Sequence, residues 1–258
     1  MSARAGVLSA LRGRVAAIET SEHRSAGVLP FGDARVDLRL SGGGLQLGRW
    51  HELKGDGLEA ETAAATAGFA ARLAAGIAQA FAGEVVWAAR RDDLYGPGAA
   101  SFGLDPDRLL LIGLRTDEEV LAAVEDALSA DGVAAVVGEV ETLDLTAGRR
   151  LQLACERRGA TGLIVRRRMA VDVKQRSVGD ASAAATRWRI APEPSAPELP
   201  RAAGLGLPRW RARLERQRGG RAGAWIFEAC DGTNSVRVAA ELGDHDLEAA
   251  PYIRLAAG

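Results

Sequence analysis

Apolar residues recur along this chain with two spacings, and the alternation between them predicts an α/β fold. Near the start, Val7, Leu11, Val15 and Ile18 recur at helical spacing, which predicts one amphipathic helix over residues 3–20. Short apolar runs typical of buried strands then alternate with longer helical segments. Strands are expected at 48–53, 85–88, 109–113, 133–137 and 163–165, and helices at 62–81, 116–128 and 146–158. The sequence therefore predicts three layers, with helices on both faces of a mostly parallel central sheet.

The regular alternation of strands and helices ends in the last third of the chain. Residues 187–190 and 224–228 look like strands separated by a proline-rich connection, which favours an antiparallel C-terminal extension of the same sheet. The final segment is acidic and weakly patterned, so we expect it to be partly disordered. The expected organisation is an N-terminal docking or oligomerisation helix with its linker (1–27), an α/β core (28–230) and an acidic tail (231–258).

The loop after the first core strand has the frame of a phosphate-binding loop without its chemistry. Such a loop reads G-x-x-x-x-G-K-[ST], but Ala60 and Glu61 stand where the second glycine and the lysine are needed. A unit charge pair about 4 Å apart is worth roughly 4 kcal/mol at an effective dielectric constant of about 20, so the exchange of lysine for glutamate removes an attraction and adds a comparable repulsion. Gly55 and Gly57 keep a flexible turn, and Thr62 keeps the hydroxyl. We therefore expect a degenerate nucleotide site and no cofactor.

The net charge of −1 hides a strong asymmetry along the chain. Residues 149–221 hold 18 basic and 6 acidic residues, a net charge of +12, while the remainder carries −13. A segment this basic, containing Trp188 and Trp210, is typical of contact with a polyanion or with an acidic partner surface. A solvated arginine-rich surface is the alternative that the charge alone leaves open.

No residue pattern indicates a metal centre or a covalent catalyst. His23, His51 and His245 are scattered, and the two cysteines, Cys155 and Cys230, lack zinc-ligand spacing. No signal peptide and no apolar run of membrane-spanning length is present in the sequence. We expect buried thiols in a protein of the reducing cytoplasm.

The order of features from Leu40 to Thr62 resembles the RecA recombinase core, and within that superfamily the chain resembles the ImuA family. The RecA resemblance rests on the glycine-rich approach at 40–49 followed by the degenerate loop. The ImuA resemblance is carried by 29–33, 42–48, Arg149-Arg-Leu-Gln-Leu-Ala154, Thr186-Arg-Trp-Arg-Ile190, 208–210 and 214–220.

This resemblance implies a RecA-like, non-catalytic accessory protein of DNA-damage-induced translesion synthesis. The implied partners are a catalytically inactive Y-family-like polymerase and an error-prone replicative-type polymerase. RecA, single-stranded DNA and a second copy bound through the N-terminal helix are further partners that it leaves open. Two other functions stay open at this point: a DNA-stimulated, filament-forming ATPase and a damage-induced cell-division inhibitor.

The resemblance also implies where ATPase chemistry has been lost. The carboxylate that positions the attacking water falls at Ala89, although Asp92 and Asp93 lie close enough for another register to supply one. The Walker B acid falls at Gly138, while Glu139 would point to the other face of a regular strand. Together with Glu61, these positions favour a protein that is not an enzyme.

The basic residues take their expected roles from the same resemblance. Arg166, Arg167 and Arg168 open the expected DNA-binding loop, in which Lys174 and Arg176 are placed to contact phosphates. A charged surface loop is the alternative. Arg216 and Arg218 fall at a basic pair that recombinases direct to a neighbouring subunit, so they are interface candidates here; simple exposure is the alternative.

Overall fold

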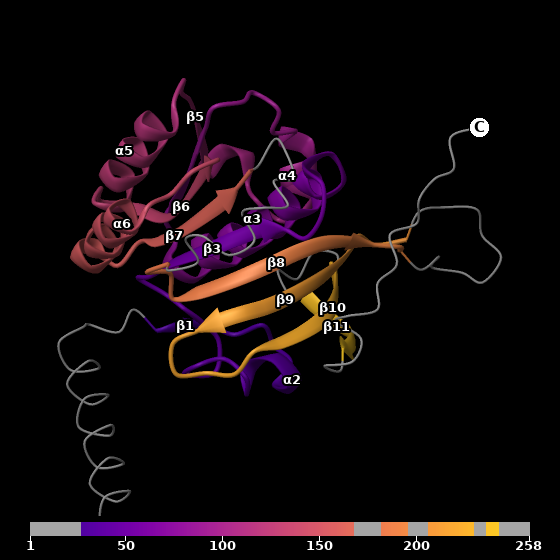
Figure 1. Ribbon diagram of the computed structural model, residues 1–258. Coiled ribbons are helices and arrows are strands. Elements are labelled where there is room, and N and C mark those ends of the chain that lie inside the picture. The colour runs from indigo at the N-terminus through magenta and orange to yellow at the C-terminus, as the bar shows by residue number, and fades with distance from the viewer. Residues whose placement is uncertain (1–26, 168–181, 196–205, 230–235, 243–258) are drawn as a thin grey trace, which may run out of the picture.

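The central feature of the fold is a nine-stranded sheet, seen in the computed structural model, which describes residues 27–167, 182–195, 206–229 and 236–242 (Figure 1). The strand order is β11-β10-β9-β8-β3-β7-β6-β4-β5, and a separate hairpin pairs β1 with β2. The strands are β1 (Val28–Leu29), β2 (Leu45–Gln46), β3 (Trp50–Gly55), β4 (Glu84–Ala89), β5 (Leu109–Gly113), β6 (Val133–Val140), β7 (Thr161–Arg166), β8 (Thr186–Glu193), β9 (Arg209–Gln217), β10 (Gly223–Ala229) and β11 (Val236–Leu242). The helices are α2 (Ala34–Asp37), α3 (Glu59–Phe81), α4 (Gly96–Ser101), α5 (Asp117–Leu128) and α6 (Leu145–Arg158), with a 3-10 turn at Pro106–Arg108.

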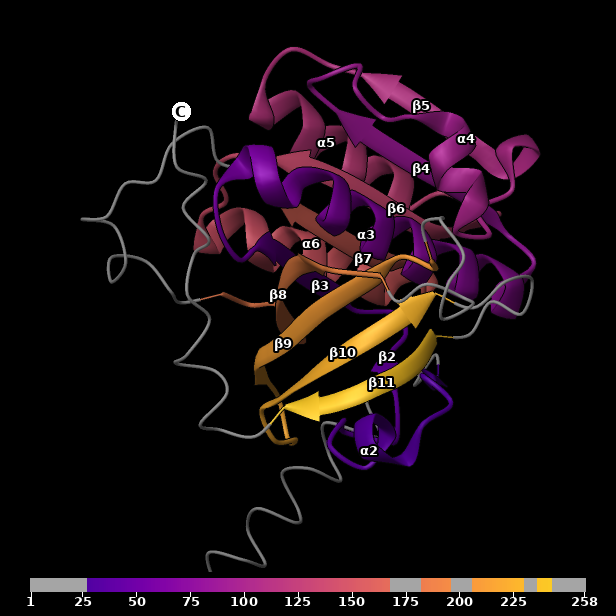
Figure 2. The same ribbon diagram turned by 90° about the vertical axis from the view of Figure 1, so that its right-hand side faces the viewer.

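Strand direction confirms the expected fold class. Neighbouring strands from β5 through β4, β6, β7 and β3 to β8 pair in parallel, whereas β8 to β11 pair antiparallel. Helix α3 covers one face of the parallel part, and α5 and α6 cover the other, as Figure 2 shows. Because all parallel strands end at the same edge, the loops after β3, β4, β6 and β7 meet there.

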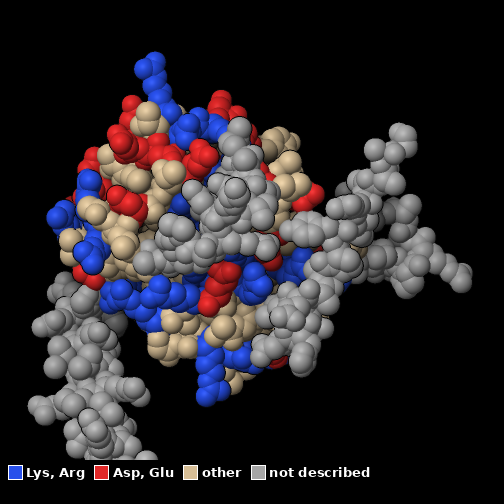
Figure 3. Space-filling view, viewed as in Figure 1, with Lys and Arg blue, Asp and Glu red and all other residues tan. Residues whose placement is uncertain are grey.

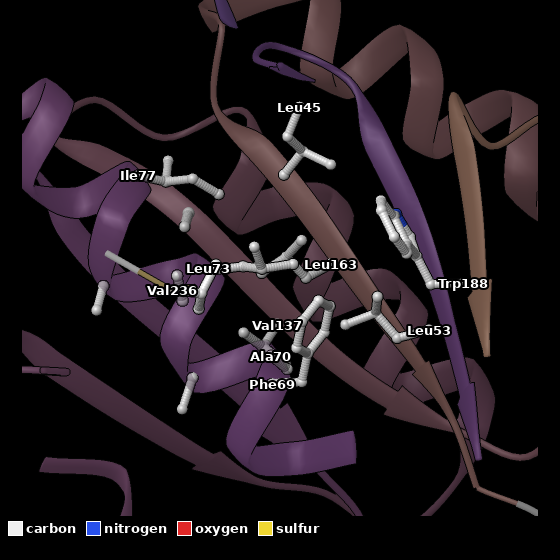
Figure 4. Packing of buried hydrophobic residues seen from close by; sticks show 14 of the residues in the cluster. Leu45, Leu53, Phe69, Ala70, Leu73, Ile77, Val137, Leu163, Trp188 and Val236 are labelled. Atoms are coloured by element: carbon white, nitrogen blue, oxygen red, sulfur yellow. The ribbon is translucent and has the colours of Figure 1, made fainter. Parts of the chain in front are cut away.

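The apolar stripe of α3 places this helix against the sheet. Phe69, Leu73 and Ile77 recur every four residues and are all buried. Figure 4 shows them facing side chains of the sheet, among them Leu53 and Trp188. Helix α3 begins at residue 59, three residues before the expected start, because the first helical turn is acidic rather than apolar and carries no periodic signal.

The start of α5 follows directly from a short sequence pattern. The Thr-x-x-Glu spacing predicts a capping box. Thr116 Oγ1 accepts from the Glu119 amide at 3.1 Å, and Glu119 Oε2 accepts from the Thr116 amide at 3.3 Å. The reciprocal pair satisfies two amides that the helix itself leaves without partners, and it fixes the helix start where it is predicted.

Two strands of the antiparallel part are absent from the sequence-based expectation. In β9 the apolar residues Trp210, Ala212 and Leu214 alternate with charged residues, so one face of the strand is buried and the other is covered with arginine. Strand β11 lies in the segment assigned to the acidic tail and pairs with β10, so the sheet continues past residue 230. In β9 the apolar alternation is outweighed by arginine, whereas β11 is a short apolar run within a segment of acidic composition.

Some expectations fall outside the described residues. These are the N-terminal helix with Val7, Leu11, Val15 and Ile18, the basic positions Arg168, Lys174 and Arg176, and the tail after residue 242. In the described ranges, no helix combines the length and the apolar character needed to cross a membrane.

Candidate functional site

The Thr62 side chain packs against the backbone of the loop after β3. A Cβ atom built on Gly55 would lie 2.1 Å from Thr62 Oγ1, so the threonine side chain packs directly on the glycine backbone. Thr62 is buried, and its hydroxyl donates to the Leu58 carbonyl at 3.0 Å. Thr62 Oγ1 therefore bonds to its own helical turn rather than facing a space where phosphate or a metal ion would lie.

The N-terminus of α3 already holds negative charge from the chain itself. Glu59 and Glu61 lie in the first turn, and no side chain caps the helix. A helix N-terminus attracts anions through its free amides and its dipole, and here these two carboxylates lie in that field. Ala60 and Glu61 are exposed, and Gly57 sits in the turn before them. A phosphate at this helix would approach two acidic side chains.

A single arginine occupies the centre of the site. Arg167 follows β7, and its guanidinium donates from Nε to Glu59 Oε1 at 2.8 Å and from Nη1 to Glu139 Oε2 at 2.6 Å. Both Nη atoms also reach Asp93, each at 2.8 Å. Glu139 Oε1 in turn accepts from Trp87 Nε1 at 2.9 Å. Three carboxylates, from the start of α3, the loop after β4 and the end of β6, therefore converge on the cation that follows β7. We call this group the Arg167 cluster (Glu59, Asp93, Glu139 and Arg167).

The charges in the Arg167 cluster stabilise its ionised form. The hydrogen bond from Arg167 is the largest cause of a lowered Asp93 pKa. Burial alone would lower the pKa of Arg167, but its hydrogen bonds to Asp93, Glu139 and Glu59 outweigh burial and raise that pKa. Arg91 Nη1 lies 3.3 Å from Glu59 Oε1, so two guanidiniums face three carboxylates and leave a net charge of −1. Both guanidiniums of this group are therefore engaged by carboxylates.

The structure decides which acid on β6 faces the site. A Cβ on Gly138 would lie 2.6 Å from Val124 of α5, so position 138 faces the layer opposite to α3. Glu139, on the other face of the strand, is 4% exposed and belongs to the Arg167 cluster. The resemblance placed the acid at position 138, whereas the carboxylate beside the start of α3 is that of the next residue. Ala89 is buried at the end of β4, and Asp93 reaches the site from the loop beyond it.

Arg166 lies in a second buried group of charges. Its Nη1 is 3.1 Å from Glu52 Oε1, and its Nη2 donates to the Glu141 carbonyl at 3.0 Å. Arg187 Nε donates to the other Glu52 oxygen at 3.0 Å, and Lys54 Nζ lies 3.3 Å from Oε1. The guanidiniums of Arg166 and Arg167 are thus both engaged inside the fold, which argues against their expected role as DNA-phosphate ligands.

The open face of the antiparallel part is covered with ion pairs rather than with free arginines. Arg189 Nε bonds Glu215 Oε1 at 2.6 Å, and Arg211 Nε lies 3.4 Å from Glu193 Oε1. Figure 3 shows basic and acidic side chains side by side over β8 and β9. These two acids are already counted in the net charge of residues 149–221, and acids outside that segment offset it further: Glu228 pairs with Arg209, and Asp56 lies 3.7 Å from Arg213 Nη2.

The two interface candidates near the end of β9 lie at the surface. Arg216 is exposed, and its Nη1 donates to the Ser182 carbonyl at 3.4 Å. Arg218 is also exposed, and its backbone amide donates to the Ala185 carbonyl at 3.2 Å. Neither belongs to the Arg167 cluster, so their expected interface role stays a prediction.

The titratable residues that often form catalytic sites have structural partners here. His51 is fully buried between Thr186 Oγ1 and the Gln46 carbonyl, each 2.7 Å away, and burial lowers its pKa to about 4. Burial raises the pKa of Cys155 to about 12, which leaves the thiol protonated and unreactive at neutral pH. Among the described residues, no group of three His, Cys, Asp or Glu side chains is arranged to hold a metal ion.

Comparison with known proteins identifies the family of this chain. No protein-family model matches the chain. Protein ImuA of Caulobacter vibrioides, from strain NA1000 / CB15N and from strain ATCC 19089 / CIP 103742 / CB 15, is 50% identical to it over 229 residues in both cases. The matched region covers 86% of this chain and 93% of each relative. The chain belongs to the ImuA family. The resemblance to the ImuA family inferred from the sequence motifs is thereby confirmed.

Sequence reasoning missed the residues that close the site. No sequence motif marks Glu59 or Trp87, or Glu52 in the second buried group, and the resemblance assigns Arg167 to DNA contact. The one available signal is the number of acids near residues 55–62, because carboxylates gathered at a helix start call for an internal cation. Which arginine supplies that cation depends on where β7 ends relative to β3, β4 and β6.

Proposed function

We propose that this chain is a non-catalytic accessory protein of damage-induced mutagenesis, which helps to assemble a translesion polymerase complex. Its expected partners are a catalytically inactive Y-family-like polymerase and an error-prone replicative-type polymerase. Membership of the ImuA family supports the role in inducible mutagenesis. The fold would then act through its surfaces, with the N-terminal helix as one docking element.

One observation supports the non-catalytic part of this proposal: the Arg167 cluster gathers at the start of α3, where the RecA resemblance implies phosphate and its metal ion. Arg167 bridges the start of α3, the loop after β4 and the end of β6. Nucleotide hydrolysis needs free space for the phosphates, a cation that stabilises them and a hydroxyl on Mg²⁺. Here the space is filled, the cation is paired with carboxylates and the Thr62 hydroxyl is turned inward.

The first test concerns nucleotide. A fluorescent ATP analogue with Mg²⁺ is expected to show no binding to the wild-type chain, or to the variant Ala60→Gly/Glu61→Lys, in an anisotropy titration. The restored loop sequence should fail because Glu59 and the rest of the Arg167 cluster keep the site closed and negatively charged. Circular dichroism controls for folding of the variant. Micromolar binding by the wild type that is lost in Thr62→Ala would overturn the proposal in favour of the ATPase alternative.

The second test concerns the partner. The chain is expected to co-purify with the inactive Y-family-like polymerase equally well with Mg²⁺–ATP and with EDTA, because no nucleotide takes part in assembly. Leu11→Asp/Val15→Asp should lower the affinity at least tenfold by placing charge on the apolar stripe of the N-terminal helix. Ser9→Asp/Ala16→Asp, on the opposite face of the same predicted helix, is the matched control. Unchanged binding by the first variant would remove the docking role of this helix.

A further inference from the structure

The parallel half of the sheet ends in an apolar strand that no described strand covers. Strand β5 stands last in the sheet order and pairs only with β4 among the described strands (Figures 1 and 2). Leu110 and Leu111 are each 55% exposed. The strand reads Leu-Leu-Leu-Ile-Gly and contains none of the charged or proline residues that commonly block pairing at an edge.

Both faces of β5 present apolar surface at this edge. Ile112 packs on the core under α5, and Leu109 packs on the core under α3. Because side chains alternate along a strand, Leu110 lies on the same face as Ile112, and Leu111 on the same face as Leu109. A strand added beside β5 would therefore cover one exposed leucine on each face while it satisfies the free backbone groups of the edge.

The charges around β5 select the kind of strand that fits. Helix α5 carries five acidic residues and no basic one, with Glu118 and Asp126 exposed. Asp105 and Asp107, just before β5, are exposed as well. Arg108 and Arg115 flank the strand, but residues 105–128 still hold seven acidic and two basic residues, a net charge of −5. Pairing of two copies through β5 would bring these acidic regions together, and like charges at close range disfavour such a dimer. A basic segment is favoured instead.

We propose that the edge of β5 is a docking site for an extended, basic segment with alternating apolar residues, supplied by the polymerase partner and added as a further strand. Main-chain hydrogen bonds along the edge provide affinity, and the leucines on the two faces select apolar side chains. This inference rests on the proposed function, since it locates a contact within the same complex.

The test compares two leucines of nearly equal exposure. Leu111→Glu is expected to lower the affinity for the inactive Y-family-like polymerase at least tenfold, measured by biolayer interferometry with the full chain. Leu153→Glu is the matched control, because Leu153 is 57% exposed but lies on α6. Leu110→Glu, on the other face of β5, should cause a loss similar to that of Leu111→Glu. Thermal melts establish that all three variants fold.

Two further measurements bear on the strand and its charge. Amides 109–113 should exchange more slowly with solvent in the complex than in the free chain. Glu118→Lys/Asp126→Lys should weaken binding, whereas strengthened binding would show that the partner is acidic and overturn the proposal. Binding that is intact in both β5 variants, or reduced as much by Leu153→Glu, also overturns it. If the wild-type chain binds no polymerase, the proposed function and the docking site are both overturned. If the chain forms dimers that Leu111→Glu dissociates, the edge of β5 belongs to a second copy, and only the docking site is overturned.

Discussion

Replacing Arg167 by alanine is expected to lower the free energy of unfolding by about 3 kcal/mol at pH 7, because it leaves buried charge without a counter-ion. Glu139 is 4% exposed and Glu59 17%, so these carboxylates cannot recover full hydration. Asp93 is 45% exposed and contributes less, which places the effect at the lower end of the range for broken buried pairs.

The stability difference between Arg167→Ala and the wild type should depend on pH in a definite direction. In the wild type, hydrogen bonds from Arg167 hold the pKa of Asp93 low, so that contribution to stability is present above the unfolded pKa and is lost as the pH falls through the folded value. Without Arg167, Asp93 loses these hydrogen bonds, so its folded pKa is no longer held low. The stability deficit of Arg167→Ala should therefore shrink between about pH 5 and about pH 3, on either side of the unfolded Asp pKa of about 3.9.

Urea denaturation at the two pH values measures this effect. Arg158→Ala is a suitable control, because the Arg158–Asp131 pair is exposed at 55% and 80% and its loss should cost less than about 1 kcal/mol. Adding Glu139→Gln to Arg167→Ala should restore part of the stability by removing one uncompensated charge. A deficit below about 1 kcal/mol that does not change with pH would show that Arg167 is not the counter-ion of this site.

Replacing Glu52 by glutamine is expected to cost about 4 kcal/mol, the second large effect, because three cations then lose their shared carboxylate. Glu52 is 1% exposed and lies within 3.3 Å of Lys54, Arg166 and Arg187. Glutamine keeps the shape of the side chain, so the effect reports charge rather than a cavity.

The pH profile separates this effect from a general loss of packing. Burial alone would raise the pKa of Glu52, but attraction to Lys54, Arg187 and Arg166 outweighs burial and lowers it. Stability from Glu52 is therefore present above its unfolded pKa of about 4.3 and lost as the pH falls through the lower folded value. Thermal denaturation between pH 7 and pH 3 should show a flatter profile for Glu52→Gln than for the wild type. Glu118→Gln, at an exposed position, should follow the wild type; if Glu52→Gln does so too, Glu52 carries no net stabilising charge.

Much of the fold follows from local patterns, and the exceptions have a common cause. The parallel strands and α3, α5 and α6 lie within a few residues of their predicted positions, because each has a strong apolar period or a cap. Strands β9 and β11 escaped prediction because their buried residues are few and alternate with charge. Apolar residues that alternate with arginine are typical of a solvated surface, and only the neighbouring strands show that one face of such a segment is buried.

The sequence by itself determined that this chain is an ImuA-type α/β protein and that Glu61 stands where the phosphate-loop pattern has a lysine. Both conclusions depend on residue identity within short segments. Only the tertiary structure decided that Glu139, rather than position 138, faces α3, and that Arg167 closes the site. The members of the Arg167 cluster are separated by many residues and meet only because parallel strands end at one edge of the sheet. Strand alternation shows that residues 138 and 139 face opposite sides, but packing decides which side meets the loop.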